Sequence, residues 1–137
     1  MLVVVASAFV PRWWAHRIGD LSNESFTRGI LAGLVLGFFC TFLPLLLAWI
    51  GIRRFRSWRG KFLVVLAAVL LAAPNLLTLS VVLGSGNAAH AGDRTLDVEA
   101  PGFRGASLAG ALAAAALAAA PIYLLRKRRR AARAATP

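Results

Sequence analysis

The chain has 137 residues, of which 59% are hydrophobic and 15% charged, and its formal net charge is +11. Apolar segments of membrane-spanning length fill most of it, which excludes a separate soluble catalytic domain and predicts one membrane domain over residues 1–137. Cys40 is the single cysteine, so an intramolecular disulfide is excluded. Eleven of the 16 basic residues adjoin apolar segments in two clusters. Such clusters are typical of topology signals and of contacts with anionic lipid head groups, and they argue against nucleic-acid binding.

Residues 1–28 are predicted to form an N-terminal interfacial segment. Its first apolar run, residues 2–10, would be about 14 Å long as a helix, which is too short to cross a bilayer. Four apolar residues then recur at helical spacing and predict an amphipathic helix at the head-group level: Val10, Trp14, Ile18 and Leu21. A loosely structured start of the chain is the alternative.

The first predicted span covers residues 29–52, which carry no charge. Gly29, Gly33 and Gly37 repeat at intervals of four residues, so they share one face of a helix. Such a face lets two helix backbones approach closely, which is how helices associate in lipid. We therefore expect a helix-packing surface here, although glycine is also common in membrane helices that have no such role.

The second predicted span covers residues 62–83, and its middle holds Pro74 and Asn75. An amide at membrane depth needs a hydrogen-bond partner, and Thr78 lies on the same helical face as Asn75. Two interpretations of this polar intramembrane site stay open. One is a structural kink with an interhelical hydrogen bond, and the other is a solute site at a broken helix. The absence of ionisable residues from all three spans favours the structural interpretation.

Residues 84–106 are predicted to form a structured loop between the second and third spans. Alternation of apolar and acidic residues over 95–99 predicts a short extended segment. Four residues of the loop could be drawn as a metal site, namely His90, Asp93, Asp97 and Glu99. Their spacing matches no recognised ligand pattern, so neither a metal nor a cofactor is predicted.

The third predicted span covers residues 107–125 and is rich in alanine, with Gly110 and Ala114 as further candidates for helix packing. A basic loop, 53–61, and a basic tail, 126–137, flank the spans, and both are predicted to be cytoplasmic. The loop 84–106 and the N-terminus then lie outside. Residues expected to contact lipid head groups are Arg53, Arg54, Arg56, Arg59, Lys61, Arg126, Lys127, Arg128, Arg129 and Arg130.

The fold class expected from these features is an all-α integral membrane protein with three transmembrane helices. Three stretches, SFTRGI at 25–30, APNLLTL at 73–79 and DVEAPGFRG at 97–105, resemble small uncharacterised actinobacterial multi-span membrane proteins, some of them loosely labelled permease. This resemblance implies a bacterial plasma membrane and assigns no site residue.

No set of nucleophile, base and orienting residue occurs in the sequence, so an enzyme is not expected. The leading hypothesis is a non-catalytic accessory subunit that packs against partner helices in a plasma-membrane complex. Its partner would be another membrane protein or further copies of the chain. The alternative is a small oligomeric transporter with its site near Pro74 and Asn75.

Overall fold

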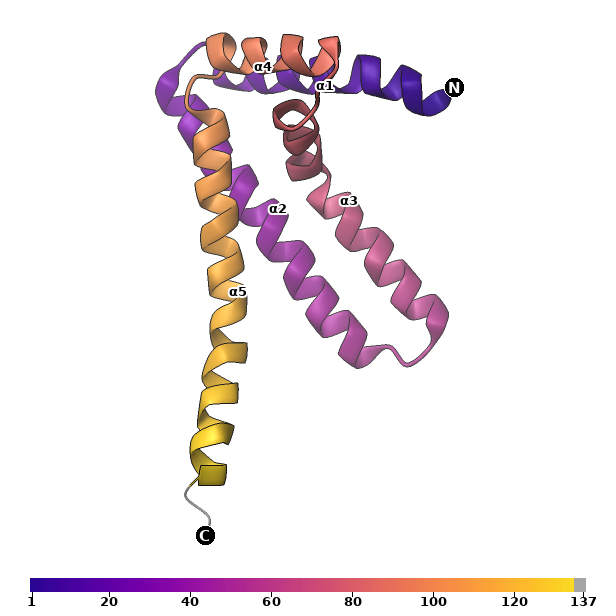
Figure 1. The fold of residues 1–137 in the computed structure, drawn as a ribbon, viewed down its shortest axis with the longest axis vertical. Coiled ribbons are helices and arrows are strands. Elements are labelled where there is room, and N and C mark those ends of the chain that lie inside the picture. Colours follow the sequence, from indigo (N-terminus) through magenta and orange to yellow (C-terminus); the bar gives the residue numbers. More distant parts are fainter. Residues whose placement is uncertain (135–137) are drawn as a thin grey trace.

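A computed structural model describes residues 1–134, and this part of the chain is entirely helical (Figure 1). Its five helices are α1 (Leu2–Ser22), α2 (Phe26–Arg54), α3 (Trp58–Val82), α4 (Asn87–Glu99) and α5 (Phe103–Ala134). Three of them, α2, α3 and α5, are long and apolar enough to cross a membrane, which confirms the predicted number of such helices. Helices α2 and α5 extend beyond their predicted spans at both ends, whereas α3 begins four residues before its predicted span and ends one residue short of it. Charged residues thus end an apolar run without ending the helix that carries it.

The three long helices share one end of the molecule, across which α1 and α4 lie side by side (Figure 1). At that end α2 begins, α3 finishes and α5 begins, while the hairpin between α2 and α3 turns at the opposite end. The basic loop and the last part of α5 are therefore remote from α1 and α4. The two short helices therefore lie across the end of the bundle where α5 begins.

The face through which α1 packs on the rest of the protein coincides only in part with the apolar face that the sequence pattern indicates. Trp14 and Ile18 are buried, but Leu21 is 63% exposed. The next buried positions after Ile18 are Gly19 and then Ser22, one helical turn after Ile18. The surface of α1 that packs on the rest of the protein therefore runs from Trp14 and Ile18 to Ser22, and Leu21 lies outside that contact.

The prediction of an extended segment at 95–99 is wrong, because these residues form the last part of α4. The buried positions of this helix include Ala89, Gly92 and Leu96, whose spacings of three and four residues are those of one helical face. Gly92 permits a close approach to α1, since an added Cβ would lie 3.0 Å from the carbonyl oxygen of Pro11. The alternation over five residues was too short a sample to separate a strand from a helix.

The most deeply buried side chains lie where α1, α4 and the bundle end meet. Phe103, Ile18, Leu96 and Val81 are the largest apolar side chains that are fully buried. A backbone hydrogen bond of 3.1 Å from the N–H of Glu24 to the carbonyl of Glu99 adds a polar link at this junction. The short helices are thus joined to the bundle by apolar packing as well as by the chain itself.

Helix α2 contacts different neighbours along its length. Its first half lies against α5 through Gly29, Gly33 and Gly37, whereas Gly51 near its end lies against Val64 of α3. Glycine at each of these positions removes the side chain that would hold the neighbouring helix away. Because the close contacts pass from α5 to α3, α2 and α5 separate toward the basic end (Figure 1).

Candidate functional site

The glycine face of α2 lies against the start of α5. A Cβ added at Gly29 would lie 2.5 Å from the carbonyl oxygen of Pro101, in the turn before α5. At Gly33 and Gly37 the added atom would overlap the backbone carbonyls of Phe103 and Ser107. These contacts involve backbone on both sides, so the two helices approach as closely as a glycine surface permits.

The small residues expected in the third span complete this contact from the side of α5. A Cβ at Gly110 would lie 2.6 Å from the carbonyl oxygen of Leu34, and Ala114 is fully buried. The structure therefore brings all five predicted packing residues into one interface within a single chain. A partner protein would have to use another surface.

Asn75 of α3 donates two hydrogen bonds to α2. Its Nδ2 group lies 2.7 Å from Oγ1 of Thr41 and 3.2 Å from the carbonyl oxygen of Gly37. The second bond ends on a glycine of the packing face, so Asn75 links α3 to the same part of α2 that contacts α5. The side-chain oxygen Oδ1 of Asn75 is buried and has no hydrogen-bond partner.

Thr78 connects α3 to α1 rather than to α2. Its hydroxyl donates to the carbonyl of Pro74 at 3.0 Å and accepts a 3.0 Å hydrogen bond from Nε1 of Trp14. Helix α3 continues through Pro74 without interruption. The three residues of the predicted intramembrane site thus lie together, but Thr78 and Asn75 bond to different helices.

The role of Trp14 is one that sequence reasoning missed. The residue was assigned to an interfacial face, whereas its indole N–H bonds to a threonine 64 positions away. The residue type alone could have indicated this hydrogen bond, since a buried indole N–H generally requires an acceptor. Nothing in the local pattern identifies which acceptor it finds.

The acidic residues of α4 form ion pairs at the end where α1 and α4 lie. Arg104 contacts Asp93 and Asp97, with a distance of 2.6 Å from Nη2 to the carboxylate of Asp97. Glu99 faces His16 of α1, with 3.6 Å between Oε2 and Nδ1. Within residues 1–134 no group of three or more potential ligands is placed to hold a metal ion. These side chains therefore join α4 to α5 and α1.

Within residues 1–134, the basic residues at the opposite end have no Asp or Glu side chain near them in the sequence. All five acidic residues of the chain precede α2 or belong to α4. The guanidinium of Arg53 instead lies over the ring of Trp49, 4.5 Å from its centroid. Arg53, Arg54, Arg56, Arg59 and Arg126–Arg130 are exposed, and Lys61 is half-buried. This end of the molecule therefore carries an uncompensated positive field.

Comparisons with protein-family models, with curated proteins and with solved structures find no match to this chain.

Proposed function

We propose that the chain is a non-catalytic accessory subunit of a membrane-protein complex in a bacterial plasma membrane. The observation that carries the proposal is a face of α5 that the helices of this chain leave uncovered. Its small residues are exposed and follow one another at spacings of four, three and four: Ala109, Ala113, Ala116 and Ala120. A face of this kind suits close packing against a helix of another protein.

The polar groups at membrane depth support a structural role over a solute path. The amide of Asn75 donates to α2, and the hydroxyl of Thr78 is engaged by Pro74 and Trp14. Groups used in this way hold helices together. The transporter remains the second candidate on one observation, which is that Oδ1 of Asn75 is buried without a partner.

The partner proposal is tested by purification of the tagged chain in mild detergent with quantification of co-eluting proteins. We expect Ala113→Leu combined with Ala116→Leu to reduce recovery of the partner at least about tenfold, since two bulky side chains separate the helix backbones. Leu70→Phe is the control, because Leu70 is an exposed residue of α3 and the change also adds bulk.

Equal recovery of the partner from the alanine double variant and wild type would contradict the use of this face. The purified chain is also reconstituted alone into liposomes. Solute flux across those liposomes, in the absence of any other protein, would reject the accessory role in favour of the transporter. An inactive chain that binds its partner through α5 is the expected result.

The orientation that we propose places the basic end in the cytoplasm and α1 and α4 outside, following the positive-inside rule. Single cysteines at Ser57 and Ser85 in a Cys40→Ala background test it with an impermeant thiol reagent on intact cells. Position 85 should be labelled directly, and position 57 only after the membrane is opened. Ser57→Cys removes the hydrogen bond from the N–H of Gly60 but no positive charge, so the topology signal is retained. Labelling of position 57 alone in intact cells would reverse the orientation.

A further inference from the structure

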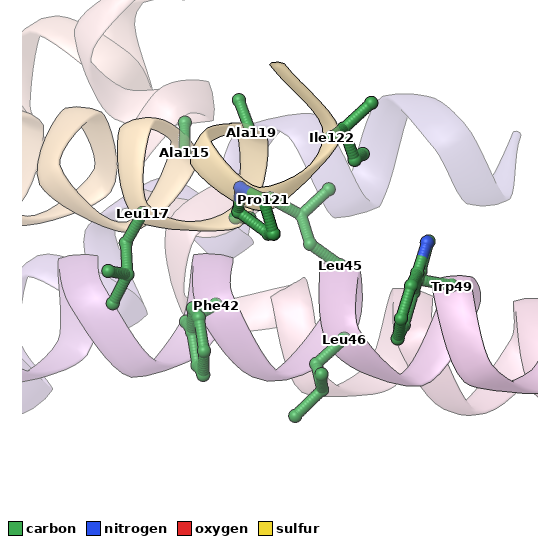
Figure 2. A pocket seen from close by; sticks show the side chains of 10 residues that line it. Phe42, Leu45, Leu46, Trp49, Ala115, Leu117, Ala119, Pro121 and Ile122 are labelled. Carbon is green, nitrogen blue, oxygen red and sulfur yellow. The ribbon is translucent and has the colours of Figure 1, made fainter. Parts of the chain in front are cut away.

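An apolar groove opens between α2 and α5 where the two helices separate. It has a volume of about 620 Å³, within the range of ~300–1,000 Å³ typical of small-molecule sites. Its lining side chains come from both helices (Figure 2). The lining residues are Phe42, Leu45, Leu46, Trp49, Ala115, Leu117, Ala118, Ala119, Pro121 and Ile122. None of these side chains carries a charge, so the groove suits a hydrocarbon chain.

The groove ends beside basic residues on both helices. Trp49 and Ile122 lie at the same end of it (Figure 2). Arg53 follows Trp49 by one helical turn and stacks on its ring, and Arg126 follows Ile122 by one turn. Residues four apart share a helix face, so each arginine extends the line of the groove toward the membrane surface.

We infer that this groove binds an anionic phospholipid, with an acyl chain between α2 and α5 and the phosphate at Arg53 and Arg126. Guanidinium groups form strong charge-assisted hydrogen bonds with phosphate oxygens. No Asp or Glu side chain belongs to the end of α2, the start of α3 or α5, so none competes for them there. The inference depends on the membrane location of the chain and not on the identity of any protein partner.

The length of the groove favours a lipid over a transmembrane helix as its occupant. The lining of α2 runs from Phe42 to Trp49, a rise of about 10 Å. A partner helix that spans the bilayer is about 30 Å long, so most of it would extend beyond the groove. Toward α1 and α4 the space between the two helices is closed by the glycine contacts, so a helix could not continue along it. An acyl chain spans one leaflet of about 15 Å, so the groove would cover most of its length.

Native mass spectrometry of the full chain in mild detergent tests the site with two probes, phosphatidylglycerol and phosphatidylcholine of the same acyl composition. We expect a stoichiometric complex with phosphatidylglycerol that is at least about tenfold tighter than that with phosphatidylcholine. Arg53→Gln with Arg126→Gln should remove this preference. Ala115→Phe with Ala119→Phe, which fills the groove, should weaken binding of both lipids.

The matched control is Arg56→Gln with Arg59→Gln, which removes one positive charge from the turn between α2 and α3 and one from the first turn of α3. Both arginines are expected to meet head groups of the surrounding bilayer, but neither follows a lining residue of the groove by one helical turn. The double change should therefore alter the preference less than about twofold. Helix content of every variant is checked by circular dichroism. An equal loss in both arginine pairs would reduce the effect to general electrostatic attraction and overturn the site. Unchanged lipid binding by a folded Ala115→Phe, Ala119→Phe variant would also overturn the site, because the lipid would then be bound outside the groove.

Discussion

Replacing Gly37 with leucine is expected to separate α5 from α2 and to remove most of the folded protein from the membrane. Even the first carbon of the new side chain would overlap backbone atoms of Ser107, and backbone cannot rotate away as a flexible side chain can. The carbonyl of Gly37 also accepts the hydrogen bond from Asn75, so displacement of α2 would disturb α3 as well. We expect a loss of stability of about 3 kcal/mol or more, at the upper end of the cost of overpacking.

The measurement is the fraction of protein that remains monodisperse after heating in detergent, together with its abundance in membranes. Gly105→Leu is the matched control, because an added Cβ at Gly105 meets no atom within 4 Å. That variant should retain wild-type stability or gain slightly from the better helix propensity of leucine. If Gly37→Leu and Gly105→Leu behave alike, the close approach of α2 and α5 is wrong.

Phe103→Ala is expected to loosen the junction of α1, α4 and α5. Phe103 is the largest side chain of the described chain that is fully buried, and it belongs to one cluster with Trp14, Ile18 and Leu96. Removal of a buried phenylalanine costs about 3–5 kcal/mol, because the lost contacts are not recovered by collapse of the cavity. The three long helices hold their own contacts, so the effect should be confined to the bundle end.

Hydrogen exchange of the full chain in detergent measures this effect locally. Amides of α1 and α4 should exchange at least about 100-fold faster in Phe103→Ala, while those in the middle of α2 and α3 change little. Phe62→Ala serves as control, since Phe62 is 62% exposed and packs less. Unchanged protection of α1 in the Phe103 variant would contradict its attachment to the bundle.

The long helices could be predicted from the sequence because an uncharged apolar run of about 20 residues has one stable form in a bilayer, the α-helix. Only part of the packing of these helices could be predicted from the sequence. The spacing of Gly29, Gly33 and Gly37 indicates that something approaches α2 closely, but it carries no information about what approaches. The neighbour proves to be the start of α5 in the same chain.

The short helices show where local pattern fails. In α4, glycine, aspartate and threonine weaken the helical signal, and alternation over 95–99 imitates a strand. A helical spacing of three and four residues is seen at Ala89, Gly92 and Leu96, but it is recognisable only over the whole segment. The bond from Trp14 to Thr78 depends on how two distant helices meet, so no window of sequence contains it.

The attachment of α1 also constrains the order of events during synthesis. Trp14 bonds to a residue that the ribosome adds 64 positions later, a delay of about 3–13 s at ordinary rates of elongation. The contacts with Leu96 and Phe103 come later still. Throughout that interval the apolar face of α1 needs temporary cover, which the head-group region of a bilayer offers to an amphipathic helix. Helix α1 is therefore made before α2–α5 but is among the last of these helices to reach its final neighbours.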